Sequence, residues 1–301
     1  MTEKHTIDKN LIIFFSITLI WTWSFGFIPV IMEIDGTPIG TFIFYFGGGA
    51  PSVTALFLVF ITYSKQQKAD YFKRCFSFHY MGMKWLFFII VFFSAITIIA
   101  LIIGVCLLKF EMPGMNYIHA IIQNPLNIFL MLIISLISGP LNEEFGWRGY
   151  ALDHLFIRYG FTGATLILGF IWSIWHLAWY FTPGQAQYDL LQNSLFNAIM
   201  YIPAVMLLNF AVSYVYVKTK RSILAGALVH MFGNLLGSQL ISPYSIDISM
   251  TIRYTKMFFC SCLAIYCIFS PKFKTEFIEE YAFAYNRYKT RSARIMNTDL
   301  Q

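Results

Sequence analysis

Long runs of apolar residues, nearly free of charge, recur along most of this 301-residue chain. A run of about 20 such residues forms a helix long enough to cross the roughly 30 Å of hydrocarbon in a bilayer. Hydrophobic residues make up 58% of the sequence and charged residues only 12%, which is about half the charged share of a typical soluble domain. The runs are continuous and do not alternate, which excludes a membrane β-barrel. We therefore predict an all-α polytopic membrane protein.

We predict about eight transmembrane helices in a single transmembrane domain over residues 1–301. The predicted spans are residues 11–32, 40–63, 85–108, 126–150, 162–181, 195–217, 222–241 and 256–270. Lys and Arg collect in alternate loops, such as 65–84 and 218–221, and in a basic tail at 272–301. By the positive-inside rule both termini lie in the cytoplasm. This distribution of the net charge of +6 favours a membrane surface over nucleic acid as the partner.

Three further patterns bear on organisation. The first apolar run is too long for a signal-peptide core and no A-x-A site follows it, so it is predicted to be an uncleaved span. The five cysteines form no C-x-x-C pair, and we expect no disulfide. Small residues at 47–50 predict close packing of helix backbones, and Pro51 can kink the helix.

The stretch at 140–155, PLNEEFGWRGYALDHL, carries charge into an apolar run. It follows residues 127–138 after a single Gly-Pro step, and the simplest prediction is one long helix. Glu144 and Arg148 share a face and can pair, while Glu143 is turned about 100° away from Glu144. Charges at bilayer depth cost at least a few kcal/mol each, so such a cluster indicates a functional site.

Three other polar side chains lie deep in predicted spans: His176, His230 and Asn234. At 1.5 Å per residue they lie roughly 14–20 Å from the cytoplasmic ends of their helices, and Glu143 lies at a similar depth. We therefore expect all four to meet in one layer. The other histidines (His5, His79, His119 and His154) are expected to be solvated or interfacial, and Asp153 and Arg158 to mark the interface.

Two chemistries suit this polar set. A carboxylate near an imidazole can take a proton from water, and His230 and Asn234 can donate hydrogen bonds to the oxyanion formed at an amide carbonyl. Alternatively, Glu143, His176 and His230 could bind Zn²⁺ with one open position. The residues leave both mechanisms open.

Three ordered motifs resemble those of the CAAX protease and bacteriocin-processing family (CPBP, also called Abi). Residues 143–148 match E-E-x-x-x-R, and residues 230–234 match H-x-x-x-N. Residues 172–176 match F-x-x-x-H with Trp172 in place of Phe. The spans that carry the motifs form a core at about 126–241.

The resemblance implies an intramembrane endopeptidase similar to type II CAAX prenyl endopeptidases, which remove the last three residues of prenylated proteins. By this likeness Glu143 and His176 activate water, and His230 and Asn234 hold the oxyanion. The supporting residues are Glu144, Arg148 and Trp172. The family is commonly labelled metalloprotease, although a metal-independent glutamate mechanism has been argued for it, and a divalent metal such as zinc stays open.

The expected partners are a membrane-bound peptide or protein substrate and the lipid bilayer. No feature of the sequence identifies a prenyl pocket, and the composition is typical of a bacterial cell-membrane protein, whose relatives serve peptide processing or bacteriocin immunity. Two alternatives are a non-proteolytic immunity or scaffold protein of the same fold, and a proton-coupled transporter with a carboxylate–histidine relay. The lack of repeated halves disfavours the transporter.

Overall fold

The computed structural model describes residues 9–111, 116–236 and 246–282, and all regular structure in these ranges is helical. The α-helices are α1 (Lys9–Ile31), α2 (Pro38–Gly48), α3 (Ala50–Thr62), α4 (Lys65–Phe76), α5 (Phe78–Leu101), α6 (Asn116–Gln123), α7 (Leu126–Ile137), α8 (Pro140–Gly146), α9 (Asp153–Trp175), α10 (Ala186–Asn193), α11 (Leu195–Lys218), α12 (Ile223–Asn234) and α13 (Ile246–Phe269). Three tighter or wider turns continue them, namely the π-helical η1 (Ile102–Leu107) and η2 (Trp147–Leu152) and the 3₁₀-helical η3 (His176–Phe181). Residues 271–282 are also helical.

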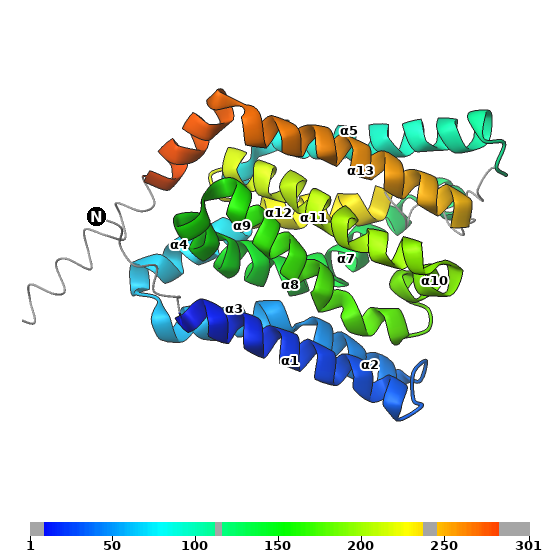
Figure 1. Ribbon diagram of the computed structural model, residues 1–301, viewed down its shortest axis with the longest axis horizontal. Coiled ribbons are helices and arrows are strands. Elements are labelled where there is room, and N and C mark those ends of the chain that lie inside the picture. Colours follow the sequence, from blue (N-terminus) through cyan, green and yellow to red (C-terminus); the bar gives the residue numbers. More distant parts are fainter. Residues whose placement is uncertain (1–8, 112–115, 237–245, 283–301) are drawn as a thin grey trace, which may run out of the picture.

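The helices pack in three layers (Figure 1). Helices α1, α2 and α3 form one side, α5 and α13 form the other, and α8, α9, α11 and α12 lie between them. The outward faces carry large exposed apolar side chains, for example Ile20 (66% exposed), Phe57 (60%) and Phe87 (70%). Exposed apolar surface on this scale suits contact with lipid and not with water.

The all-α membrane fold is confirmed, and the number of spans stays a prediction. Five helical segments in the described ranges are long and apolar enough to cross a bilayer, and α2 with α3, bent by 47°, makes a sixth. One of the five runs from Leu126 to Phe181 and contains two of the predicted spans. Gly160, at φ 63°, turns the chain between them; this backbone conformation favours glycine.

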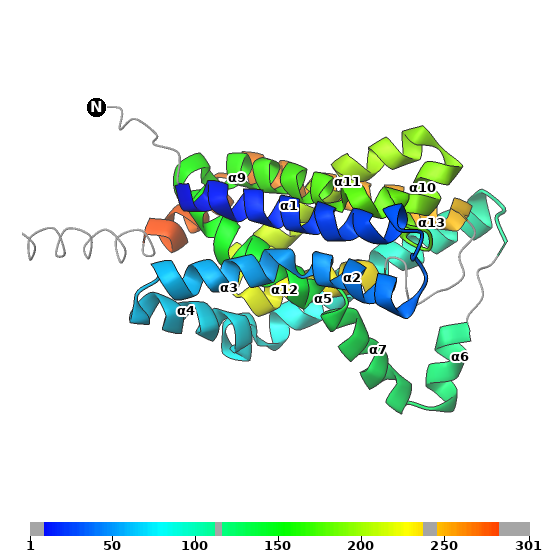
Figure 2. The same ribbon diagram turned by 90° about the horizontal axis from the view of Figure 1, so that it is seen from below.

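Two predicted boundaries are wrong. The predicted long helix at 126–150 is broken at Ser138–Gly139, because Pro140 cannot continue a helix and instead begins α8. As a result α7 leads away from the bundle toward α6 (Figure 2). The last apolar helix begins at Ile246, ten residues before the predicted start at 256, and so it includes Arg253.

The basic loops predicted for one side of the membrane do gather at one end of the bundle. Asp153 joins them: its carboxylate lies 2.7 Å from Arg221 Nη2 and 3.2 Å from Arg74 Nη1, and it accepts a hydrogen bond from the Tyr281 hydroxyl at 2.7 Å. Burial raises the pKa of that hydroxyl well above its usual range, so Tyr281 stays a donor at neutral pH. Asp153, expected at the interface, is thus buried among cations. Which side of the membrane this end faces stays a prediction.

Several minor expectations have clear outcomes. All five cysteines are free. His79 and His119 are exposed, and His154 is partly buried against the Tyr150 ring, at 4.4 Å between centroids. Part of the predicted surface segment 65–84 forms the polar helix α4. His5 and most of the predicted basic tail lie outside the described residues.

The close packing predicted for the glycine run is confirmed at Gly47. Thr22 of α1 donates a hydrogen bond to the Gly47 carbonyl oxygen at 2.9 Å, and a Cβ on Gly47 would lie 2.9 Å from Phe25 Cβ. A Cβ on Gly48 would meet only Trp179 Cζ2, at 3.8 Å, which is an ordinary contact. The close contact between α1 and α2 therefore requires glycine at position 47 and does not require it at position 48.

These neighbouring glycines give a matched test. We expect Gly47→Ala to destabilise the protein by about 1–3 kcal/mol, because the added methyl forces α1 and α2 apart. Gly48→Ala should be neutral or slightly stabilising, since alanine favours helix more than glycine does. Thermal unfolding of the purified protein in detergent measures both. Equal midpoints for the two variants would contradict this account of the packing.

Candidate functional site

The described residues line a partly open cavity of about 1250 Å³. Its wall includes four side chains that the sequence placed in one layer, Glu143, His176, His230 and Asn234. They come from α8, η3 and α12, and Trp172 of α9 lies with them. Glu143, His176 and His230 are buried, at 6%, 8% and 4% exposed. Residues from three separate motifs thus meet at one cavity.

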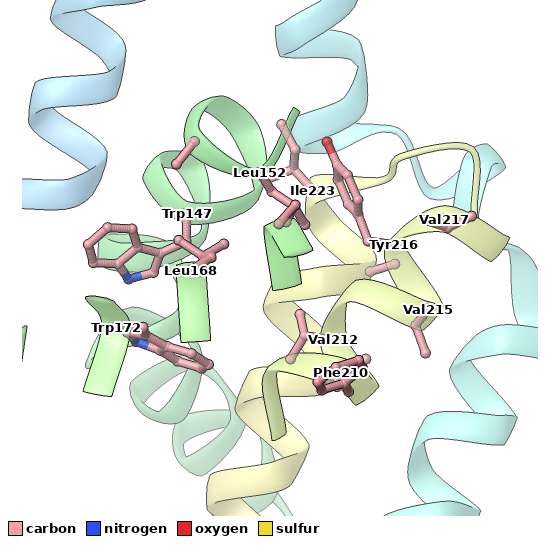
Figure 3. Close-up of a cluster of buried hydrophobic side chains, with 14 of the residues drawn as sticks. Trp147, Leu152, Leu168, Trp172, Phe210, Val212, Val215, Tyr216, Val217 and Ile223 are labelled. Carbon is pink, nitrogen blue, oxygen red and sulfur yellow. The ribbon is translucent and has the colours of Figure 1, made fainter. Parts of the chain in front are cut away.

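Glu143 is held by two tryptophans. Its Oε2 atom accepts hydrogen bonds from Trp172 Nε1 at 2.6 Å and from Trp147 Nε1 at 3.3 Å. Trp147 is one turn ahead of Glu143, and Trp172 comes from α9; Figure 3 shows both indoles in the buried cluster. Because both donors meet the same oxygen, neither engages Oε1. The Trp at 172 also supplies an N–H donor that the Phe of the family pattern lacks.

Glu144 and Arg148 lie behind this wall and are fully buried, at 0% exposed each. The pair expected from their spacing is present, with Arg148 Nη1 2.9 Å from Glu144 Oε1. Arg148 Nη2 donates to Asn209 Oδ1, and Asn209 Nδ2 donates to the Thr165 carbonyl oxygen at 2.7 Å. Asn209 was missed by the sequence analysis. Its signal is an amide in the middle of the apolar helix α11, where a buried amide requires partners.

Each histidine makes a contact that determines its tautomer. His176 Nδ1 lies 2.9 Å from the Trp172 carbonyl oxygen, and His230 Nδ1 lies 2.9 Å from Glu144 Oε1. A carbonyl oxygen only accepts, and the Glu144 carboxylate paired with Arg148 also only accepts. Both Nδ1 atoms therefore carry a proton. In the neutral rings the lone pair lies on Nε2.

The backbone is irregular where these residues lie. The π-helical turn η2 begins at Trp147, directly after α8, and contains Arg148. A 3₁₀ turn begins at His176, directly after α9. π-helical turns are rare and occur frequently at functional sites. Here the π-helical turn overlaps the end of the first motif, and the 3₁₀ turn begins at the last residue of the second.

The cavity also has a wall that the sequence analysis missed. Arg253 and Lys256 of α13 line it, together with Tyr201 of α11. Arg253 was missed because the predicted last span began at 256, which placed it in a loop. Across residues 9–111, 116–236 and 246–282, no group of three or more His, Cys, Asp or Glu side chains lies close enough to hold one metal ion.

Comparison with known proteins identifies the region that carries the motifs. Residues 125–236 match the family model described as type II CAAX prenyl endopeptidase Rce1-like. A CAAX prenyl protease 2 from Methanococcus maripaludis is 22% identical over 241 residues, which are 78% of this chain and 86% of that protein. The match begins one residue before the predicted core at 126–241 and includes all three motifs. The expected resemblance to type II CAAX prenyl endopeptidases is thereby confirmed: residues 125–236 are similar to the Rce1-like family model, and most of the chain is distantly similar to a CAAX prenyl protease 2.

Proposed function

We propose that this protein is an intramembrane endopeptidase that hydrolyses a peptide bond in a membrane-associated protein or peptide. The observation that carries the proposal is Glu143 at the cavity wall, its carboxylate held by two indoles, with His176, His230 and Asn234 around the same cavity. A carboxylate at a cavity wall, with one oxygen held by indole donors, is positioned to act as a general base toward a water in the cavity. The family match over the same segment supports the reaction class.

The chemistry follows from these positions. Glu143 takes a proton from a water molecule whose oxygen bonds to the peptide carbonyl carbon, and His176 Nε2 accepts the second hydrogen bond of that water. Asn234 and His230 donate hydrogen bonds to the oxyanion. Donation from His230 Nε2 requires the imidazolium, whose charge Glu144 balances at Nδ1. The C–N bond then breaks, and the proton on Glu143 passes to the leaving amine.

Replacement of the base tests the proposal. We expect Glu143→Gln to lower kcat/KM by at least about 100-fold while the protein stays folded. Released peptides and membrane-protein termini are compared in cells that express the native protein, Glu143→Gln or the control Glu279→Gln, which changes an exposed carboxylate. Fragments present with the native protein and the control, and absent with Glu143→Gln, also name the substrate.

The same comparison separates the alternatives. Identical fragments in all three cell lines would contradict the endopeptidase proposal. If a cellular phenotype of the native protein also persisted with Glu143→Gln, the proposed function would become a binding or scaffold role. A farnesylated peptide with its cysteine fourth from the C-terminus is the first synthetic probe, because the matched family and relative act on CAAX prenyl substrates by name.

A second prediction concerns the positioning of Glu143 by Trp172. We expect Trp172→Phe to lower kcat by about tenfold or more with little change in KM, because the carboxylate loses its shorter hydrogen bond. Trp175→Phe is the matched control. It also removes a buried indole donor, one that bonds to Thr22 Oγ1 at 2.7 Å and not to Glu143. Equal kcat values for the two variants, at equal losses of stability, would show that Trp172 only packs.

We also propose that the water is activated without a resident metal ion, because the described side chains do not form a group of three ligands. Peptide release should stay within about twofold of its rate after treatment with 1,10-phenanthroline or EDTA followed by gel filtration. Loss of activity that zinc restores would contradict this and favour Glu143, His176 and His230 as ligands.

A further inference from the structure

Helix α13 contributes two cationic side chains, Arg253 and Lys256, to the cavity wall. They are three residues apart, which places them on neighbouring positions of one helix face. The helix that carries them is one of those long and apolar enough to cross a membrane. Two cations inside such a helix are costly unless an anion compensates them.

Among the described residues, no carboxylate forms an ion pair with either cation, although Glu143 and Asp189 line the same cavity. Arg253 stacks over the Tyr201 ring, with Cζ 5.4 Å from its centroid, and its Nη1 atom is buried without a hydrogen-bond partner. Lys256 Nζ reaches only a neutral partner, the Gly233 carbonyl oxygen, at 3.3 Å. Within the described ranges neither cation forms an ion pair with Asp or Glu, and the adjoining stretch 237–245 contains neither residue type.

The two cations lie close to the reacting groups. The Tyr201 ring also contacts His176, at 5.4 Å between centroids, and Gln187 Nε2 donates to the Tyr201 hydroxyl at 2.7 Å. Arg253 Cζ and the centroid of the His176 ring each lie 5.4 Å from the Tyr201 centroid, so they are separated by at most the sum of these two distances. An extended peptide advances about 3.3–3.6 Å per residue, so about three residues cover that separation.

We propose that Arg253 and Lys256 bind a carboxylate of the peptide substrate, within about three residues of the cleaved bond; the inference rests on the proposed function. The carboxylate is either the C-terminal α-carboxylate or an acidic side chain. A guanidinium with an unused donor matches the two oxygens of a carboxylate. A lipid phosphate is the weaker candidate, because the cations share a cavity with Glu143 and His176, where the peptide itself must lie.

Binding of small peptides tests this independently of cleavage. The first probe is acetyl-Ala-Leu-Ala as its free acid and as its C-terminal amide, and the second pair is acetyl-Asp-Leu-Ala amide and its Asn analogue. Affinities are measured by calorimetry for the native protein, Arg253→Gln, Lys256→Gln and the control Lys274→Gln, which changes an exposed lysine. Arg253→Lys is the conservative variant if Arg253→Gln does not fold.

We expect the native protein and the Lys274 control to bind one carboxylate form about 10- to 100-fold more tightly than its neutral partner. That preference should fall to near unity in Arg253→Gln and Lys256→Gln, with affinity for the neutral peptides unchanged. The pair that shows the preference identifies the source of the carboxylate.

Three results would overturn the proposal. They are equal or undetectable binding of acid and neutral peptides by the native protein, a preference that survives both substitutions, and affinity that follows the phosphatidylglycerol content of the micelle in place of the peptide charge. Failure of the endopeptidase proposal is seen separately, as fragments that are independent of Glu143 while the carboxylate preference remains.

Discussion

The fully buried ion pair between Glu144 and Arg148 is the interaction on which the site depends. It joins α8 to η2, and through Asn209 and His230 it also holds α11 and α12. Two charges inside a membrane protein are costly to bury, and removal of one partner leaves the other uncompensated, at a cost of about 3–5 kcal/mol. Each charge has further partners, Asn209 and the Trp172 ring for Arg148 and His230 for Glu144, while Glu144 Oε2 and Arg148 Nε are buried without a hydrogen bond. The orientation of His230 is therefore a consequence of the same pair.

This centre is connected to the charged end of the bundle through one tyrosine. The Tyr216 hydroxyl lies 2.9 Å from the Arg148 carbonyl oxygen and 2.9 Å from Asp153 Oδ1. Arg74 of α4 donates to the same hydroxyl at 2.7 Å, so a polar helix outside the three layers is tied to the motif. Surface ion pairs are worth little, but these groups are buried and share hydrogen bonds, which gives the network a definite geometry. The wide turn η2 lies between the two clusters, and both of its ends are thereby held.

Local spacing predicted what lies within one helix, and tertiary contacts determined the rest. The Glu144–Arg148 pair and the shared cavity of His230 and Asn234 follow from a separation of four residues. The break before Pro140 was visible as a Gly-Pro step, but periodicity alone favoured a continuous helix. No local pattern could show that Asn209 meets Arg148, or that the Trp172 indole meets Glu143, because these partners are 61 and 29 residues apart. Arg253 was not predicted as a cavity residue for a different reason: because it is charged and lies near a helix end, it was assigned to a loop.

The distribution of charge in the cavity has a consequence for how a peptide lies in it. His176 and Arg253 both contact the Tyr201 ring, and Glu143 lines the same cavity. If the C-terminal carboxylate of a peptide binds Arg253, the direction of the bound chain is fixed. The reverse direction would place the N-terminus of the peptide, and not its carboxylate, at the cations. The separation between Arg253 and the His176 ring then determines which peptide carbonyl can reach the water beside Glu143. Only a carbonyl about three residues or fewer from the bound carboxylate can do so. The length of the released fragment would thus be determined by the spacing between Arg253 of α13 and the reacting groups on α8 and η3, and not by recognition of particular side chains.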